Sequence, residues 1–288
     1  MNQFYQEIMQ LKEAEEFKAV IRRWHILSEN LRTKPMDVPV LLPDMLWVAR
    51  SGVGKTNLLE LMSEYLASQK NLMDFYGDVK FFEFYLNYCP PSSHFGELKR
   101  LMEEIQNAAG FRSEYRGVVY IDICEWLDHF EEKHFVSFME YLSTYSDKWL
   151  VVLGINPASK EKIQKLKAFV SMYLRLETVT LTFPKTGDLF VFIEGLLQEY
   201  GLSLEDDAKK MLFDTIEKMR NSKYFDGYRT IIMLCQDIVY DVFSKENIED
   251  LSLSAEMLSK FSSDSEYITN MIANYERISR SIGFVDKE

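Results

Sequence analysis

The stretch ARSGVGKTN, residues 49–57, constrains the fold more than any other part of the chain. An apolar run, DMLWVA, precedes it, and the amphipathic run KTNLLELMSEYLASQ follows it, so the sequence predicts a buried strand, a glycine-containing loop and a helix. In such a unit, successive backbone N–H groups of the loop surround an anion, and the positive end of the helix dipole faces the same point. The sequence therefore predicts a phosphate-binding loop at the end of a sheet strand.

The residue types in this loop point to a nucleoside triphosphate, and we expect ATP with Mg²⁺. Glycines give the backbone freedom and room for close approach, a lysine reaches the β- and γ-phosphates, and a threonine hydroxyl ligates Mg²⁺. The residues predicted to hold the nucleotide are Ser51, Gly52, Val53, Gly54, Lys55, Thr56 and Asn57, with Lys55 also catalytic and Thr56 also a metal ligand. Ala49 stands where such a loop usually opens with glycine, and we expect it to be tolerated at negative φ.

Strand and helix patterns alternate along the first two thirds of the chain. The predicted strands are residues 44–49, 78–86, 117–123, 148–156 and 177–183, and the predicted helices between them are residues 55–69, 96–109, 133–146 and 159–174. Strict alternation with short runs rich in Val, Ile and Phe is typical of a parallel sheet covered by helices on both faces. We therefore predict an α/β fold that binds its ligand at the carboxyl ends of the strands.

Strand patterns largely stop after Pro184, and the rest of the chain has helical spacing. We predict three parts: an N-terminal helical segment over residues 1–35, a nucleotide-binding α/β domain over 36–184, and an all-helical lid with C-terminal helices over 185–288. Gly201 is expected to end one lid helix, and Ser203 to cap the next one, with Asp206 at its third position. The sequence assigns no role to residues 246–288.

Polar residues at two other strand ends complete the predicted site. Asp122 follows the apolar residues of GVVYID, where a carboxylate can hold Mg²⁺ through a water beside Thr56. Asn156 ends VVLGIN on the next predicted strand, where its amide can orient an attacking water or touch the γ-phosphate. Taken alone, each residue is also an ordinary turn former, and the loop upstream is what favours the catalytic interpretation.

Composition excludes several other classes of protein. The formal net charge of −12 disfavours general binding to nucleic acid, because an acidic surface repels phosphate backbones. The three widely spaced cysteines form no CxxC pair, so the sequence indicates neither a disulfide framework nor a zinc site. The four histidines show no metal-ligand spacing either. The amino terminus lacks an apolar signal core, and no apolar stretch is long enough to cross a bilayer. We expect a cytoplasmic protein without membrane contact.

The order of phosphate loop, acidic strand, polar strand end and helical lid resembles that of AAA+ ATPases. Within them the chain is most similar to the bacterial CbxX/CfxQ group, the red-type rubisco activase relatives, over roughly residues 8–245. FVFIEGLLQEYGLSLEDDAKKML resembles that group's first lid helices, and YFDGYRT resembles its FGNAR lid motif. The resemblance implies that Arg229 senses the γ-phosphate, that His94 and Phe95 in HFGEL lie at a substrate-gripping pore loop, and that the chain forms a homo-oligomeric ring that remodels a protein partner.

Two departures from the family pattern concern hydrolysis. The family's acidic strand ends in Asp-Glu, where the Glu polarises the attacking water, whereas Ile123 follows Asp122 here. Glu125, three residues after Asp122, is the replacement base that we consider, although a turn after the strand would aim it elsewhere. The family also has a Ser-Arg-Phe-like stretch before its last strand, where this chain has MYLRLE. Arg175 is therefore the candidate arginine finger, and a solvent-exposed arginine at a strand edge is the alternative.

Three functions follow from the sequence. The first is an AAA+ ATPase that couples binding and hydrolysis of Mg-ATP to the remodelling or regulation of a protein partner. The second is a binding or scaffold module that holds ATP without turnover, because Ile123 replaces the Glu. The third is a DNA-associated ATPase, such as a helicase loader or transposition regulator, which the acidic charge disfavours.

Overall fold

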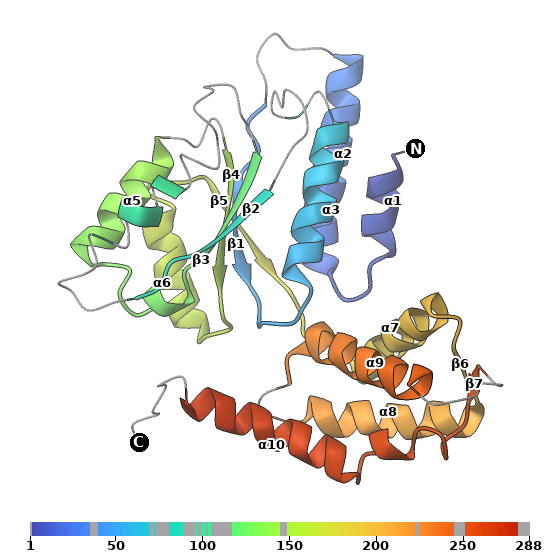
Figure 1. The fold of residues 1–288 in the computed structure, drawn as a ribbon. Helices are drawn as coiled ribbons and strands as arrows, with labels where there is room; N and C mark the ends of the chain where they lie inside the picture. The colour runs from blue at the N-terminus through green and yellow to red at the C-terminus, as the bar shows by residue number, and fades with distance from the viewer. Residues whose placement is uncertain are drawn as a thin grey trace. The chain divides into compact units, whose positions relative to one another are not determined.

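One unit of this computed structural model contains a five-stranded sheet with flanking helices, and the other consists mainly of helices (Figure 1). The units are Met1–Arg50 with Lys55–Thr182, and Ser51–Gly54 with Phe183–Glu288. The structure describes residues 2–34, 40–69, 72, 81–88, 96, 99–101, 103–104, 117–144, 149–222, 225–244 and 251–281.

Every strand pair in the large sheet is parallel, as the alternating pattern predicts. The strands are β1 (Asp44–Val48), β2 (Phe81–Tyr85), β3 (Gly117–Asp122), β4 (Trp149–Ile155) and β5 (Leu176–Thr180). They lie in the order β2-β3-β4-β1-β5. Because β1, β3 and β4 are neighbours, the three strand ends that carry the predicted phosphate loop, carboxylate and amide meet at one edge of the sheet.

Helices cover both faces of this sheet, which explains why its central strands read as unbroken apolar runs (Figure 1). On one side lie α1 (Gln3–Gln10), α2 (Glu15–Thr33) and α3 (Lys55–Ser68), and on the other lie α5 (Lys133–Ser143) and α6 (Lys160–Val170). The short 3₁₀ helix η1 (Cys124–Trp126) directly follows β3. Of the helix predicted over residues 96–109, only six residues are described.

The two faces of β3 have different partners because side chains alternate along a strand. Val119, Ile121 and the following Ile123 are fully or almost fully buried in a core with aromatic residues of α5, among them Phe135 and Phe138. Tyr120 and Asp122 alternate with them and therefore lie on the side of α3. The face on which each residue of GVVYIDI lies is thus fixed by the period of two.

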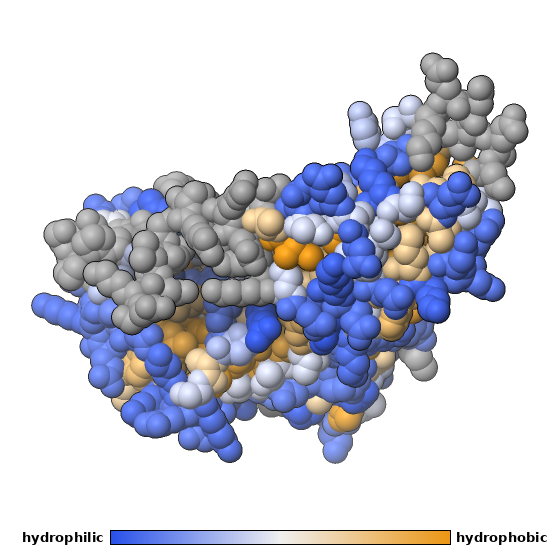
Figure 2. Space-filling view, turned by 90° about the horizontal axis from the view of Figure 1, so that it is seen from below, coloured by the Kyte–Doolittle hydropathy of each residue, from blue (hydrophilic) through white to orange (hydrophobic). Residues whose placement is uncertain are grey.

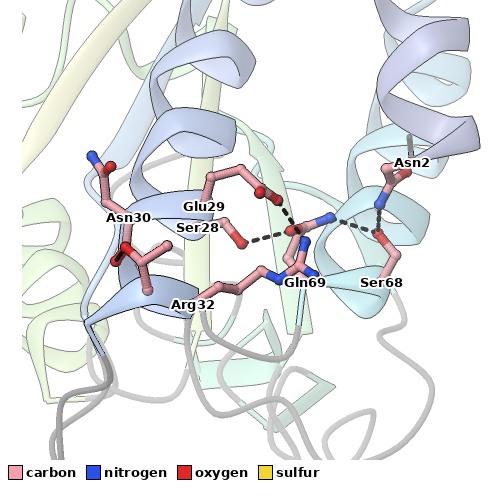
Figure 3. A network of polar contacts seen from close by, with 8 residues as sticks. Asn2, Ser28, Glu29, Asn30, Arg32, Ser68 and Gln69 are labelled. Atoms are coloured by element: carbon pink, nitrogen blue, oxygen red, sulfur yellow. Dashed lines mark hydrogen bonds and ion pairs between the residues drawn. The ribbon is translucent and has the colours of Figure 1, made fainter.

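A polar network joins the C-terminal ends of α2 and α3 (Figure 3). The buried hydroxyl of Ser28 donates to Oε1 of Gln69 over 2.6 Å, and Nε2 of Gln69 donates to Oγ of Ser68 over 3.3 Å. Asn2, just before α1, donates to the same Ser68 hydroxyl. These bonds tie the N-terminal helices to the helix that follows the predicted phosphate loop, and burial of Ser28 is tolerated because its hydroxyl has a partner.

The second unit is mostly helical but contains a small sheet, so the prediction of an all-helical lid is wrong in this detail. Its elements are α7 (Thr186–Glu199), β6 (Ser203–Leu204), α8 (Asp206–Arg220), α9 (Gly227–Phe243), β7 (Ser252–Leu253), η2 (Ser259–Phe261) and α10 (Glu266–Ser281). Gly201, with φ of +77°, follows the end of α7 as predicted. Ser203 pairs with Ser252 in the small parallel sheet instead of capping α8, and Glu205 stands at that N-cap.

Among the helices that the structure describes, none has the length and apolarity needed to cross a bilayer. On the face drawn in Figure 2, hydrophilic residues predominate and hydrophobic residues gather in separate patches.

Candidate functional site

The predicted phosphate loop begins at the carboxyl end of β1. The N–H of Ala49 continues the parallel ladder beyond the strand and donates to the carbonyl of Ile155 over 2.9 Å. Ala49 is 1% exposed, and Glu13 is the one described non-glycine residue with positive φ. Alanine therefore replaces glycine here without backbone strain, and its methyl group is packed at the end of the sheet.

Two glycines give the loop its shape. Gly52 and Gly54 have φ of +74° and +85°, in the left-handed region that strains other residues. The helix α3 begins immediately afterwards at Lys55, so the N–H groups of its first turn follow the loop directly. Ser51 is exposed and Val53 is buried. This strand, loop and helix have the arrangement of an anion-binding turn at a helix N-terminus.

Within the second unit, Gly52 lies against the turn that precedes α9. Its carbonyl accepts a hydrogen bond of 2.9 Å from the N–H of Tyr228. A Cβ atom built on Gly52 would lie 2.0 Å from the carbonyl oxygen of Asp226, and one built on Gly227 would lie 2.2 Å from the carbonyl oxygen of Gly52. Gly227 also has a positive φ of +51°. Close backbone approach therefore requires glycine at both positions.

Lys55 and Asp122 come together across the unit that contains the large sheet. The ammonium of Lys55 lies 3.6 Å from Oδ2 of Asp122, and each side chain is 18% exposed. The lysine comes from the first turn of α3 and the aspartate from the end of β3. The two opposite charges predicted for phosphate and metal binding thus contact each other.

Two further donors face the Asp122 carboxylate. The backbone N–H of Cys124 donates to Oδ1 over 3.0 Å, and the phenol of Tyr120 donates to Oδ2 over 3.4 Å. Tyr120 is 2% exposed, and burial, aided by the Asp122 charge, raises the pKa of its phenol far above the ordinary value. The phenol therefore stays protonated and acts as a donor to Asp122.

Ile123, at the position where the resemblance noted above implies a glutamate, is fully buried on the opposite face of β3. Its N–H bonds to the carbonyl of Gly154 over 2.9 Å, which continues the ladder with β4 past Asp122. The backbone therefore directs this side chain into the core with Phe135 and Trp126. No group at this position acts on a water molecule at the strand ends.

Glu125 lies in η1, on an exposed position after the strand. Its Oε2 accepts a hydrogen bond of 2.7 Å from the backbone N–H of Tyr88, in the segment after β2. The ring of Tyr88 stacks on His129 with centroids 3.9 Å apart. The carboxylate of Glu125 is therefore engaged with the β2 segment in this conformation.

Asn156 is the first residue after β4 and is exposed. Cys124 lies between this strand end and Asp122: its Sγ is 4.0 Å from the carbonyl oxygen of Gly154. Burial, together with a hydrogen bond to Asp122 and the charge of that residue, raises the pKa of the Cys124 thiol to about 12, although Lys55 and the N–H of Asn156 act in the opposite direction. Cys124 is thus a neutral thiol at the centre of the site.

The two arginines lie in different settings. Arg175 is exposed and directly precedes β5, at the amino end of the sheet, whereas Asp122 lies at a carboxyl end. In the register of the sheet, Asp122 is level with Gly154, Trp47 and Val179 on the three strands beyond β3. Val179 is four residues after Arg175 in the chain, which is a separation of roughly 13 Å along the strand at 3.3 Å per residue. An arginine side chain does not span that separation together with the width of three strands.

Arg229, near the start of α9, is bonded to a carboxylate in its own unit. Its Nη1 lies 3.1 Å from Oδ2 of Asp226, and the arginine side chain is 73% exposed. A surface pair of this kind contributes little to stability. Little free energy is therefore lost when Arg229 leaves Asp226 for another anion.

The residues predicted to hold Mg²⁺ fit that ion. Thr56 is exposed in the first turn of α3, and the Asp122 carboxylate is partly exposed beside Lys55. Mg²⁺ is typically held by one or two carboxylates together with waters and substrate phosphates, so an all-protein cage is not needed. The described part of the chain contains no cluster of three or more His, Cys, Asp or Glu residues that could hold a metal on its own.

Sequence reasoning missed two residues of this site, Tyr120 and Cys124. The signal for Tyr120 is its position two residues before Asp122 in a strand, which puts both on one face with a polar tip in an apolar run. No signal in the sequence points to Cys124, because its position depends on the turn after β3. His94 and Phe95, predicted at a pore loop, lie outside the described residues.

Comparison with solved structures identifies the fold. Two variants of Thermotoga maritima RuvB match the chain, each with 13% sequence identity. The first has a TM-score of 0.52 and covers 92% of this chain and 78% of its own. The second has a TM-score of 0.51 and covers 91% of this chain and 77% of its own. Caenorhabditis elegans PCH-2, 16% identical, has a TM-score of 0.49 over 93% of this chain and 68% of its own. No protein-family model matches the sequence, and no curated protein does. The sheet and its flanking helices have the AAA+ P-loop NTPase fold, as the sequence predicts.

Proposed function

We propose that the chain binds Mg-ATP and couples its binding and slow hydrolysis to the remodelling or regulation of a protein partner. The observation that carries this proposal is the meeting of Lys55 and Asp122 beside a loop with glycines at φ of +74° and +85°. A lysine after such a loop binds β- and γ-phosphates, and a carboxylate at the adjacent strand end binds Mg²⁺ through water. The AAA+ fold supports the same function.

In this proposal each residue of the site has a separate task. The loop from Ser51 to Asn57 wraps the phosphates, Thr56 and Asp122 hold Mg²⁺, and Asn156 orients the attacking water. Mg²⁺ supplies charge neutralisation of the phosphates when bound. Arg229 exchanges Asp226 for the γ-phosphate, which links nucleotide binding to α9.

We further propose a cytoplasmic homo-oligomer of the CbxX/CfxQ type. Arg175 supports an assembly, because it lies at the amino end of β5 and is too far from Asp122 to act in its own site. An exposed arginine can act on the nucleotide of a neighbouring copy, as fingers supplied in trans do. The neighbouring copy would then complete the site.

The second candidate function is a nucleotide-gated module without turnover. It is favoured by the burial of Ile123 and by the hydrogen bond that engages Glu125 with the N–H of Tyr88. Without a base or water-positioning group, hydrolysis is slower by about 10²–10⁴-fold. The two functions share nucleotide binding and differ only in hydrolysis.

Binding and phosphate release by four proteins separate these functions: wild type, Lys55→Ala, Glu125→Ala and Lys165→Ala, the last a control on an exposed face of α6. We expect Lys55→Ala to lose nucleotide affinity by at least about tenfold, and Lys165→Ala to match the wild type. Wild-type phosphate release above that of Lys55→Ala supports the ATPase. Equal phosphate release by the wild type and Lys55→Ala, even at high protein concentration with the partner present, contradicts the ATPase and leaves only the binding module. Equal phosphate release by Glu125→Ala and the wild type excludes Glu125 as the base.

A further inference from the structure

The phenol of Tyr120 is directed at the same carboxylate oxygen that Lys55 approaches. It lies 3.4 Å from Oδ2 of Asp122, while the ammonium of Lys55 lies 3.6 Å from that atom. The ammonium is also 5.4 Å from the centre of the Tyr120 ring, within the range of a cation–π contact. Tyr120 therefore contacts both charged residues of the proposed nucleotide site.

The neighbouring strand leaves room for this phenol. Gly154 on β4 is the register partner of Asp122, and a Cβ atom built on it would lie 1.9 Å from the Tyr120 hydroxyl. Any other residue at this position would displace the ring. The glycine thus allows a tyrosine to lie across β4 with its hydroxyl next to the strand end.

Burial of this hydroxyl is costly unless it makes a hydrogen bond. Phenylalanine would fill the same apolar space without that cost, since the ring of Tyr120 already packs near Trp47 with centroids 6.2 Å apart. The hydroxyl therefore contributes through its bond to Asp122. A phenol is an uncharged donor, so it orients the carboxylate without cancelling its negative charge.

In the proposed function, nucleotide binding changes the partners of Asp122. When Lys55 turns to the β- and γ-phosphates, it leaves Oδ2 of Asp122, and Tyr120 is then the side chain still donating to that oxygen. We propose that Tyr120 is a positioning residue for Mg-nucleotide binding, whose hydroxyl holds the Asp122 carboxylate in orientation after Lys55 has moved to the phosphates. This inference rests on the proposed nucleotide-binding function.

Tyr65 provides a matched control. It is another fully buried tyrosine of the same unit, on α3, and its hydroxyl has no hydrogen-bond partner among the described residues. Tyr65→Phe therefore removes a buried hydroxyl that orients nothing. Comparison of the two Tyr→Phe variants isolates the bond to Asp122 from the general effect of losing a phenol.

The test titrates Mg²⁺ into each protein in the presence of a fluorescent ATP analogue and measures binding rather than turnover. For Tyr120→Phe we expect binding in EDTA within about twofold of the wild type and a Mg²⁺ requirement raised by about tenfold or more, as for other partners of metal-ligating groups. Tyr65→Phe should match the wild type in both. A merely structural role for Tyr120 would weaken binding equally with and without Mg²⁺, and that result overturns the inference.

A double-mutant cycle with Asp122→Asn tests whether Tyr120 acts through Asp122. In the Asp122→Asn background, Tyr120→Phe should have no further effect on the affinity for the analogue, measured at a Mg²⁺ concentration that saturates the wild type. An additive loss contradicts the inference, as does a wild type that binds the analogue without any dependence on Mg²⁺. Absence of binding by the wild type itself instead refutes the proposed function, so the two failures are distinguishable.

Discussion

The ammonium of Lys55 and Oδ2 of Asp122 lie 3.6 Å apart, and both side chains are mostly buried. The pair joins the start of α3 to the end of β3, the two elements from which the phosphate and metal ligands are predicted to come. A ligand that uses Lys55 for its phosphates must compete with this carboxylate. Asp122 is therefore the counterion of Lys55, and the affinity of Lys55 for phosphate depends on how strongly this pair is held.

Loss of the Asp122 charge should have opposite effects with and without metal. In Asp122→Asn, Lys55 no longer has a carboxylate to leave, so ADP in EDTA should bind about three- to tenfold more tightly, as expected for loss of a partly buried ion pair. Mg²⁺ should no longer strengthen ATP binding. Isothermal titration with and without Mg²⁺ measures both, and Asp128→Asn, which removes an exposed carboxylate paired with Lys162, is the control. Weaker ADP binding in EDTA would show that the pair does not compete with phosphate.

Restoring the acid next to Asp122 should not create a better ATPase. Ile123 is fully buried in the apolar core, so Ile123→Glu places a carboxylate among aromatic side chains, and we expect the free energy of unfolding to fall by about 3 kcal/mol or more. Ile123→Val, which keeps the packing, should lower it by about 1 kcal/mol. Urea denaturation and phosphate release check the two effects. A stable Ile123→Glu protein with faster release would mean that this strand end can turn the side chain toward the site.

The contact between Gly52 and Gly227 should tolerate no side chain. Gly227 has φ of +51°, and a Cβ atom there would lie 2.2 Å from the carbonyl oxygen of Gly52, so Gly227→Ala must break the bond from the N–H of Tyr228. We expect destabilisation by about 1–3 kcal/mol, together with weaker nucleotide binding. Gly195 is exposed inside α7, and a Cβ atom built on it would have nothing within 4 Å outside its own helix backbone, so Gly195→Ala should instead stabilise by about 0.5–1 kcal/mol. Thermal unfolding of the two variants gives the comparison, and similar shifts would contradict it.

Asp44 should make stability depend on pH. It is 4% exposed at the start of β1, where burial raises its pKa from 3.8 to about 7 and a hydrogen bond of 2.8 Å from the N–H of Val151 acts in the opposite direction. Between pH 3.8 and about 7 the Asp44 carboxyl is therefore protonated in the folded chain and ionised in the unfolded chain. The contribution of this group to the free energy of unfolding is complete below the unfolded pKa of 3.8 and is lost as the pH rises through about 7. Over this range the free energy of unfolding should fall by at most about 4 kcal/mol.

Asp44→Asn retains an acceptor for the N–H of Val151 and does not titrate. Its free energy of unfolding relative to the wild type should therefore increase steadily from about pH 4 to about pH 7 and then stay constant. Denaturant unfolding across this range measures the difference. A difference that does not change with pH would show that the Asp44 carboxylate titrates normally.

Local patterns in the sequence were enough for most of the fold. Alternating apolar runs and amphipathic helices predict a parallel sheet, because strands buried on both faces need apolar residues throughout and the crossovers need helices. The glycine spacing before Lys55 predicts the loop, and both glycines have the positive φ that this requires. The small sheet formed by Ser203 and Ser252 was not predictable in this way, since its two strands are two residues long and far apart in sequence.

What the sequence determined by itself is the type of site: a loop with the glycines and the lysine that phosphates require, followed by a carboxylate at a strand end. The loop and the strand end are each predicted from residues within a few positions of one another. Only the tertiary structure decided that Ile123 lies in the core, that Glu125 contacts the N–H of Tyr88, and that Tyr120 and Lys55 both face Oδ2 of Asp122. These relationships depend on how strands and turns distant in sequence pack, and packing is a property of the whole sheet rather than of any one segment.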